Sequence, residues 1–273
     1  MENQKEELRK KTRSLEDILE STPHTEVNLP SEGIIYPKDN ILSKGKLHIR
    51  YLKGKDEEIL LSPKNLKDTG FADLLLKRVV LEPNFNVLDL SIGDKMYLLL
   101  ASRISSLGDE YRYKHFECNF CGHEEEDIKF KISESIKDAP KIHNPIQENK
   151  NVFETTLPMS GDVIKMKTIT GHDMKQFEKK SESLKRVGQE LTTMNMLSVL
   201  ILDTSAIKDE EVSEGRLLKY VDDLIMGDIN ALKKFLREIR RTPEDTITYK
   251  CPKCERKQEI PISFGFDFFF PEY

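Results

Sequence analysis

All four cysteines of this chain lie in two short C-x-x-C pairs, Cys118–Cys121 and Cys251–Cys254. A C-x-x-C turn, here called a knuckle, places two thiolates side by side and so provides half of a tetrahedral zinc site. Two knuckles supply the four ligands that a closed structural site needs. The 130 positions from Cys121 to Cys251 far exceed the spacing within a compact zinc ribbon. The chain must therefore fold so that two distant segments meet.

The histidines near the first knuckle leave open whether each knuckle closes a site of its own. His115 and His123 could complete a four-ligand set there, whereas the matching positions of the second knuckle are Thr248 and Arg256. We therefore expect one structural Zn²⁺ per chain, shared by both knuckles and without an open position for catalysis. The alternative is that the cysteines are reduced thiols that hold no metal.

The composition favours folded lobes with charged surfaces. Hydrophobic residues make up 37% of the 273 residues, charged residues 33%, and the net charge is −5. This acidity argues against a general affinity for nucleic acid. No apolar segment approaches the roughly 18–20 residues of a membrane span, and the first residues lack the apolar segment of a secretory signal. Paired cysteines without such a signal indicate metal binding in a reducing compartment.

Four short patterns recur in the same order, which predicts an internal duplication. The pairs are Leu29-Pro-Ser-Glu-Gly33 with Leu157-Pro-Met-Ser-Gly161, Ile49–Asp56 with Met166–Asp173, Gly93-Asp94 with Gly227-Asp228, and the two knuckles. Leu29 to Leu157 is 128 positions, Asp56 to Asp173 is 117, Gly93 to Gly227 is 134, and Cys118 to Cys251 is 133. Since the last two spacings nearly agree, we expect two similar halves.

The predicted fold class is α+β, with two strand–helix–knuckle halves joined by a shared, zinc-ribbon-like four-cysteine site. Each half is expected to contain a strand, helices and a knuckle flanked by strands: 47–52, 94–106, 111–117 and 127–132 in the first, and 163–169, 228–241, 246–250 and 258–262 in the second. The expected domains are a charged N-terminal helix or tail (1–27), a first half (28–135), a linker (136–155), a second half (156–265) and an aromatic tail (266–273).

Four aspartates precede the expected helices and invite comparison with paired catalytic carboxylates. They are Asp56, Asp94, Asp173 and Asp228. Because aspartate is a favoured N-cap that accepts backbone N–H bonds, we interpret all four as structural helix caps. The isolated histidines, His24, His48, His143 and His172, are interpreted as surface or loop residues. No catalytic motif is present, so no catalytic residue and no enzymatic activity are expected.

Both ends of the chain carry apolar residues whose partners the sequence leaves open. Five phenylalanines crowd positions 264–270. Such a segment must be buried, either against its own domain or in a neighbouring subunit. We therefore name Phe268, Phe269, Phe270 and Pro271 as candidate partner-binding residues. Residues 1–20 predict a charged helix with a thin apolar line, either solvated or partner-binding.

A basic helix face near the second knuckle supports an alternative function, a nucleic-acid-binding zinc-ribbon regulator. Its residues are Lys233, Lys234, Arg237, Arg240 and Arg241. Glu238 and Glu244 on the same segment, together with the acidity of the whole chain, favour a solvated face instead.

Several segments resemble one family of tailed-phage proteins, the T4-type baseplate hub and hub-assembly proteins. They are Leu29-Pro-Ser-Glu-Gly-Ile-Ile-Tyr-Pro37, Ile49-Arg-Tyr-Leu52 with the Gly-x-Asp-Glu-Glu that follows, Leu107-Gly-Asp-Glu110 before the first knuckle, the second knuckle, and Phe268-Phe-Phe-Pro271. The resemblance spans roughly residues 28–273. The Leu-Pro-Ser-x-Gly-x-x-Tyr-Pro pattern is its most specific part, because knuckles alone occur in many proteins.

The resemblance implies a non-enzymatic role in building the baseplate of a contractile tail. The expected partners are other phage baseplate or hub proteins, with no small-molecule substrate, no membrane and no nucleic acid. The expected location is the bacterial host cytoplasm during assembly, and retention in the virion baseplate is left open. Family members differ in whether they remain in the particle, so hub subunit and assembly factor are both open.

Overall fold

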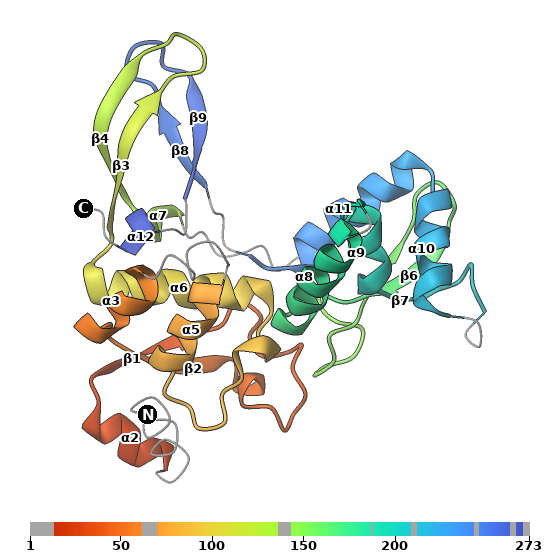
Figure 1. Cartoon of the computed structure of the whole chain (residues 1–273), viewed down its shortest axis with the longest axis horizontal. Coiled ribbons are helices and arrows are strands. Elements are labelled where there is room, and N and C mark those ends of the chain that lie inside the picture. Colours follow the sequence, from red (N-terminus) through yellow and green to blue (C-terminus); the bar gives the residue numbers. More distant parts are fainter. Residues whose placement is uncertain are drawn as a thin grey trace.

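The computed structural model describes residues 14–61, 70–135, 143–186, 188–208, 212–242, 246–262 and 266–269. Figure 1 shows three parts: a first lobe, a pair of β-hairpins standing on it, and a second lobe to one side. Helices and strands are mixed in the chain, as the sequence predicts. Most of residues 1–20, expected to be a helix, lie outside the described residues, and the described helix α2 covers Leu15–Ser21.

The first lobe packs helices against a two-stranded antiparallel sheet. Its strands are β1 (His24–Asn28) and β2 (Lys46–Arg50), and its helices are α3 (Gly54–Leu61), α5 (Gly70–Val79) and α6 (Ile92–Leu107), with 3-10 turns η1 (Ile41–Lys44) and η2 (Val87–Asp89). Alternating β2 residues Leu47 and Ile49 are fully buried, as are Leu75 and Leu76 of α5. Val80, just beyond α5, forms an antiparallel bridge to Ile49 and extends this sheet.

The second lobe packs helices against a three-stranded antiparallel sheet. Its antiparallel sheet has the order β5 (Phe153–Thr156), β6 (Val163–Met166), β7 (Ile201–Thr204), and its helices are α8 (Gly171–Arg186), α9 (Thr193–Leu200), α10 (Glu214–Asp223) and α11 (Met226–Ile239). Ile164 and Met166 of β6 and Leu232 of α11 are fully buried. Strand β5 includes residues 153–155, which the sequence assigned to the linker; Phe153 pairs with Met166.

The hairpins form a small separate core. Strand β3 (Glu110–Glu117) pairs with β4 (Glu124–Lys131), and β8 (Thr246–Lys250) pairs with β9 (Lys257–Pro261). Phe116, Ile128 and Ile260 pack with buried cysteines between the two hairpins, which stand side by side in Figure 1. The short helices α7 (Ile132–Ser135) and α12 (Phe266–Phe269) lie at their base. A hairpin from the middle of the chain and one near its C-terminus therefore share one core.

The lobes meet where α6 and α8 begin. Ser91 and Thr170 form an antiparallel bridge, the Ile92 N–H donates to the Ile169 carbonyl (3.0 Å), and the Gly171 N–H donates to the Leu90 carbonyl (3.0 Å). Two glycines make this approach possible. A Cβ on Gly93 would lie 2.3 Å from the Arg240 oxygen, and one on Gly171 would lie 2.7 Å from the Leu88 Cα. The junction thus has no room for a side chain at either position.

The aromatic tail folds back onto its own chain at two of its four candidate positions. Phe268 and Phe269 are 0% and 1% exposed. The Phe268 ring packs 5.9 Å from the Tyr111 ring, and the Phe269 ring 6.4 Å from the Phe71 ring. Buried Arg103 fixes this segment, donating from Nε to the Phe268 carbonyl at 2.8 Å. The sequence left open whether the tail is buried in its own domain or in a neighbouring subunit, and these two rings are buried in their own domain. Phe270 and Pro271 lie outside the described residues.

Candidate metal centre

Each knuckle is built by the same two backbone hydrogen bonds. The Cys118 N–H donates to the His123 carbonyl at 2.8 Å, and the Gly122 N–H donates to the Cys118 carbonyl at 2.9 Å. In the second knuckle Cys251 and Glu255 make the matching bonds, to the carbonyls of Arg256 (3.0 Å) and Cys251 (2.9 Å). Gly122 and Glu255 both have positive φ, 62° and 60°. The turns are therefore alike in conformation although their sequences differ.

The two knuckles bring all four thiols together. The Sγ atoms of Cys118, Cys121, Cys251 and Cys254 lie within 4.8 Å of one another. Across the hairpins, Cys118 Sγ lies 3.6 Å from Cys254 Sγ, and Cys121 Sγ lies 3.8 Å from Cys251 Sγ. A tetrahedral zinc with bonds of about 2.3 Å separates its sulfurs by about 3.8 Å. The four thiols thus fit a tetrahedral metal in spacing and in chemistry.

Aromatic packing and hydrogen bonds between the hairpins hold the knuckles in register. The Tyr249 ring lies edge-on to Phe116, with centroids 4.7 Å apart, and its hydroxyl donates to a Glu125 carboxylate oxygen. The Asn119 N–H donates to Gln258 Oε1 at 2.9 Å. These contacts link β3 and β4 to β8 and β9 independently of the sulfurs.

The thiols differ in acidity. Burial raises the pKa of the Cys118 thiol, but hydrogen bonds from the backbone of Phe120 and Cys121 outweigh it and lower that pKa to about 7. Burial raises the pKa of Cys121 to about 12, because a backbone hydrogen bond from His123 does not compensate for it. Without a metal, the cluster therefore holds one thiolate more readily than several. A bound cation would neutralise the sulfurs and so remove the electrostatic cost of holding several thiolates close together.

No histidine joins the cluster. Within the described ranges, the four cysteines are the one group of His, Cys, Asp and Glu side chains close enough to share a metal ion. His115 and His123 therefore do not complete a site at the first knuckle. The isolated histidines bond elsewhere: His24 to the Thr22 carbonyl, His48 to Glu82, His143 to Glu238 and His172 to Asp89.

The four aspartates named as helix caps are structural, but none occupies the N-cap itself. Each is the third residue of its helix, in α3, α6, α8 and α11. The N-cap residues of α6 and α11 are Ser91 and Ile225. The cap assignment is therefore corrected to a position in the first helical turn. The aspartates lie three positions beyond the N-cap, and helix boundaries predicted from a sequence are uncertain by about two to four residues, which accounts for the difference.

Two of these aspartates form hydrogen bonds that link the start of a helix to the segment before it. Asp56 accepts hydrogen bonds from the Lys53 N–H (2.8 Å) and from Arg50 Nη1 and Nη2 (2.7 and 2.9 Å). Asp173 accepts from the Thr170 N–H at 2.9 Å, and Lys167 Nζ lies 2.6 Å from its other oxygen. In both lobes the carboxylate thus binds the backbone three residues earlier and a cation six residues earlier.

The other two aspartates bind the Leu-Pro turns. Asp94 accepts from the Ser31 N–H at 2.9 Å and from the Tyr36 hydroxyl. Asp228 accepts from the Met159 and Ser160 N–H groups at 2.8 and 3.0 Å. Sequence reasoning missed Tyr36, although it belongs to the Leu-Pro-Ser-x-Gly-x-x-Tyr-Pro pattern. Burial raises the pKa of Asp94, despite hydrogen bonds from Ser31 and Tyr36 that lower it.

The basic face of α11 is partly occupied by contacts within the chain. Arg241 is 4% exposed and donates to the His143 carbonyl and to Asn144 Oδ1 at 2.7 and 3.0 Å. Lys234 lies 3.8 Å from Glu238. These contacts leave a weaker cationic surface than the sequence suggests, so they do not favour nucleic-acid binding.

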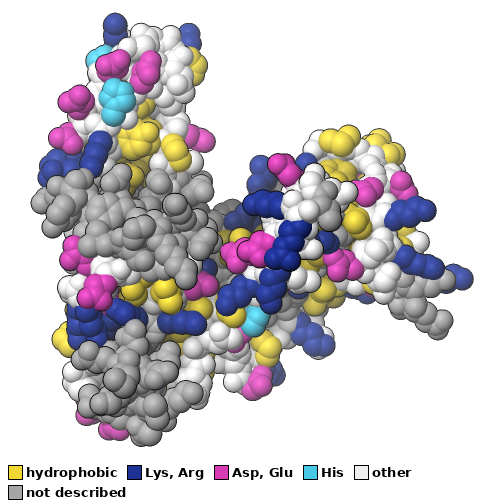
Figure 2. Space-filling model, viewed as in Figure 1, with side chains coloured by type: hydrophobic (Ala, Val, Ile, Leu, Met, Phe, Trp, Pro, Cys, Tyr) yellow, Lys and Arg dark blue, Asp and Glu magenta, His cyan; other side chains and the backbone are white. Residues whose placement is uncertain are grey.

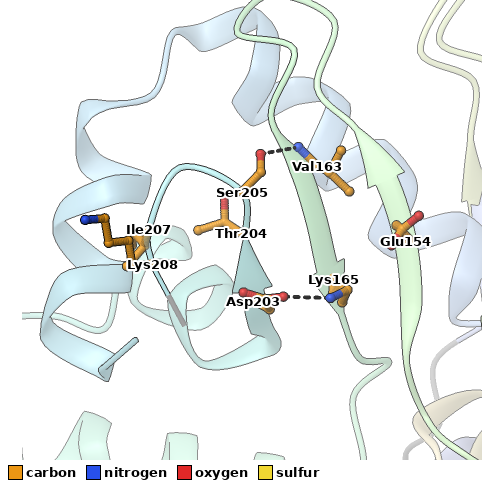
Figure 3. A pocket seen from close by; sticks show the side chains of 8 residues that line it. All are labelled: Glu154, Val163, Lys165, Asp203, Thr204, Ser205, Ile207 and Lys208. Carbon is orange, nitrogen blue, oxygen red and sulfur yellow. Dashed lines mark hydrogen bonds and ion pairs between the residues drawn. The ribbon is translucent and has the colours of Figure 1, made fainter. Parts of the chain in front are cut away.

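A hollow of about 600 Å³ lies on the sheet of the second lobe (Figure 3). Lys165 and Asp203 form an ion pair of 2.8 Å across its floor, and Ser205 Oγ accepts from the Val163 N–H at 2.9 Å. These polar groups on the floor of the hollow therefore already bond to one another. No convergent set of catalytic side chains accompanies them, and we assign the hollow no ligand.

Residues 22–271 match the protein family described as T4 bacteriophage base plate protein. The chain belongs to this family. Neither the curated proteins nor the solved structures contain a significant match to it. Membership of this family points to a structural protein of the phage tail baseplate, in contact with other baseplate proteins, and away from catalysis. No helix within the described residues is long and apolar enough to cross a bilayer.

Proposed function

We propose that this baseplate-family chain is a structural or assembly protein of the hub of a contractile-tail baseplate, and that one structural Zn²⁺ per chain joins the hairpin in the middle of the chain to the hairpin near its C-terminus. The observation that carries the proposal is the single four-cysteine cluster with two thiols from each hairpin. A metal bound there closes a loop of more than half the chain, and its binding free energy becomes folding free energy. With four protein ligands it leaves no open position for catalysis.

The zinc would join two halves that arose by duplication. Matched contacts support this part of the proposal. Asp56 and Asp173 each bind the backbone three residues earlier, and Asp94 and Asp228 each bind the third residue of a Leu-Pro turn, Ser31 or Met159. Descent of both halves from one ancestral segment would account for these matched contacts.

The baseplate role predicts that the chain functions through surfaces presented to other baseplate proteins. It would act in the host cytoplasm during assembly, and remaining in the tail would make it a hub subunit. The test is to purify virions and hub intermediates from infected cells and to locate the chain by mass spectrometry. Presence in the intermediates supports the proposal, and presence in virions as well identifies a subunit. Absence from both would overturn the baseplate role.

Residues 270–273 allow a separate test of the tail as a docking segment. The deletion must begin after Phe269, because Phe268 and Phe269 belong to the core. We expect the shortened chain to keep its zinc and its unfolding midpoint but to fail to enter hub intermediates. Phe120→Ala, a change of an exposed ring at the first knuckle, is the control and should enter normally. Normal incorporation of the shortened chain would exclude docking by residues 270–273.

Chromatography of the purified chain tests the alternative function, a nucleic-acid-binding regulator. A regulator that binds the phosphate backbone is retained on heparin or DNA, and its retention falls steeply with salt. We expect the purified chain to elute at low salt. Steeply salt-dependent retention, lost on replacing Lys233 and Lys234 with glutamate, would favour the regulator instead.

A further inference from the structure

The junction between the lobes uses one face from each lobe. The first lobe contributes the segment from Leu88 to Gly93, where α6 begins. The second lobe contributes the segment from Ile169 to His172, where α8 begins, and the end of α11 at Arg240 and Arg241. A hydrogen bond closes one side of the junction, with His172 Nε2 2.9 Å from Asp89 Oδ1. We call these the α6 face and the α8 face.

Each face has a counterpart in the other lobe. At the spacing of 134, Val87-Leu-Asp-Leu-Ser-Ile-Gly-Asp94 aligns with Val221-Asp-Asp-Leu-Ile-Met-Gly-Asp228, so Asp89 corresponds to Asp223 and Gly93 to Gly227. At the spacing of 117, Gly171 corresponds to Gly54 and His172 to Lys55. The end of α11, Arg240-Arg241, corresponds to Ser106-Leu107 at the end of α6. Each lobe therefore contains both kinds of face.

None of the residues that the structure describes covers the glycine of either counterpart face with backbone. Gly54 is exposed, and a Cβ placed on it would meet no described atom within 4 Å, whereas one on Gly171 would meet the backbone of Leu88. A Cβ on Gly227 would meet only the flexible Met159 side chain. Large apolar side chains beside these glycines are exposed: Tyr51 and Leu107 in the first lobe, and Met159, Ile225 and Met226 in the second.

Charge and position also fit a mutual contact. Asp222 and Asp223 are exposed beside Ile225, and Lys53 and Lys55 are exposed beside Gly54. Figure 1 places α3 on the side of the first lobe that faces away from the second lobe, and α10 at the outer end of the second lobe. Figure 2 shows hydrophobic side chains along the upper edge of the second lobe, where α11 begins in Figure 1. The two open faces thus lie at opposite ends of the molecule.

We propose that the α11 face of one copy, built around Ile225, Met226 and Gly227, docks onto the α3 face of a second copy, built around Leu52, Gly54 and Leu107, and repeats between chains the junction that joins the lobes within one chain. We assign a second copy of this chain as the partner, because each chain carries both of the faces that would meet. The corresponding pair of faces is already in contact at the junction between its own lobes. The proposal rests on the duplication proposed above.

The contacts of the new interface follow from those of the internal one. The Met226 N–H donates to the Leu52 carbonyl, the Gly54 N–H donates to the Leu224 carbonyl, and Lys55 pairs with Asp223. The start of α11 is consistent with this, since its N-cap, Ile225, makes no side-chain hydrogen bond to the first turn. The contact joins unlike faces, so it is heterologous and builds a ring or an open chain of copies.

The test measures the mass of the purified, zinc-loaded full chain by light scattering during size-exclusion chromatography. The wild-type chain is expected to form species larger than a monomer as its concentration rises. Gly54→Arg and Gly227→Arg each block one face and should each be monomeric. Gly215→Arg, at an exposed glycine of α10 with open space around it, is the matched control and should assemble as the wild type does. Equal zinc content and equal unfolding midpoints show that the variants fold.

A mixing experiment tests the pairing of unlike faces. The Gly54→Arg chain keeps its α11 face and the Gly227→Arg chain keeps its α3 face, so their mixture should give a capped dimer with one copy of each. Asp223→Lys and Lys55→Glu should each weaken assembly, and the double variant should restore it. A wild-type chain that stays monomeric up to its solubility limit, or a mixture that forms no dimer, would overturn the proposal.

Failure of this test would not affect the baseplate role, because hub intermediates are examined separately. A monomeric chain that still enters hub intermediates would refute self-association alone. A chain that self-associates but is absent from both intermediates and virions would refute the baseplate role alone.

Discussion

The Sγ atoms of Cys118 and Cys254 lie 3.6 Å apart although 136 positions separate the two residues in the chain. The contact forms because the hairpin that ends the first half packs on the hairpin near the end of the chain, around Phe116, Ile128 and Ile260. This aromatic and aliphatic core is small, so a metal would supply much of the stability of the paired hairpins.

The first prediction is that removing one cysteine releases the metal. Cys251→Ser should reduce the zinc content from one per chain to none, because three thiolates cannot close a tetrahedral structural site. Structural zinc contributes on the order of 10 kcal/mol in small zinc domains, so the hairpins should also lose protection from proteolysis. Native mass spectrometry measures the stoichiometry. His123→Ala is the control, and zinc kept by Cys251→Ser but lost from His123→Ala would assign the ligands differently.

The second prediction compares two glycines at corresponding positions. Gly93→Ala should lower the free energy of unfolding by about 1–3 kcal/mol, because the added Cβ meets the rigid backbone of Arg240 at 2.3 Å. Gly227→Ala should change it by no more than about 0.5 kcal/mol, because the Met159 side chain can move. Urea unfolding of both variants measures the difference. Equal effects would show that the junction tolerates a side chain at Gly93.

The third prediction concerns the buried carboxylates on the Leu-Pro turns. Asp228→Ala leaves the Met159 and Ser160 N–H groups without their acceptor, and Asp94→Ala does the same to Ser31 and Tyr36. Each unsatisfied buried donor costs about 1–3 kcal/mol, so Asp94→Ala should be strongly destabilised, because Ser31 and Tyr36 are buried. Asp228→Ala should cost less, because Met159 and Ser160 are exposed and water can replace the carboxylate, but more than a surface change. Thermal unfolding is the measurement. Exposed Asp222→Ala is the control, and a loss as small as that of the control would contradict the role assigned to these turns.

The fourth prediction uses the Arg50–Asp56 ion pair. Arg50→Met removes the closest cation from the buried Asp56 carboxylate and leaves it with the Lys53 N–H and with Arg78 Nη1 at 3.7 Å. The loss should be about 3 kcal/mol at neutral pH, the lower end of the cost of breaking a buried pair. The exposed pair of Lys46 with Glu26 provides a control, since Lys46→Ala should cost no more than about 1 kcal/mol.

The same pair predicts a pH dependence. Burial raises the pKa of Asp56, but hydrogen bonds from Arg50 and the Lys53 backbone, together with the charges of Arg50 and Arg78, outweigh it and hold that pKa below its usual value. A carboxyl group with a lowered pKa contributes stability at neutral pH that is lost as the pH falls through its folded-state value. The wild-type chain should therefore lose this contribution below about pH 4. Arg50→Met should show a smaller acid response, because only the Lys53 N–H and Arg78 then favour the Asp56 carboxylate. An acid response as large as that of the wild type would contradict the assignment.

The fifth prediction separates core from surface aromatics. Phe268→Ala should cost about 3–5 kcal/mol, because the ring is fully buried against Tyr111 and Arg103. Phe120→Ala removes a ring that is 54% exposed beneath Arg256 and should cost no more than about 1 kcal/mol. Urea unfolding compares the two. Similar small losses would show that Phe268 does not belong to the core.

Local patterns predicted much of the secondary structure. Strands around each knuckle follow from β-branched and aromatic residues beside the turn cysteines, and α11 follows from apolar residues repeating with helical period. The expected helix 228–241 corresponds to α11 at Met226–Ile239. Helix starts were less accurate. Ser91, which caps α6, carries a weaker sequence signal than Asp94 three residues later, because Asp94 belongs to a recurring pattern.

By itself the sequence determined the residues that would hold a metal, since all four cysteines lie in two knuckles, and the order of the elements that carry them. Only the tertiary structure decided which surfaces those elements cover. Phe268 and Phe269 could have filled a neighbour's groove or their own core, and a local pattern records only that they must be buried. The local sequence around Gly93 resembles that around Gly227, yet only Gly93 lies against the backbone of a distant segment. Which segment packs on a given glycine is decided by the whole fold and not by the local sequence.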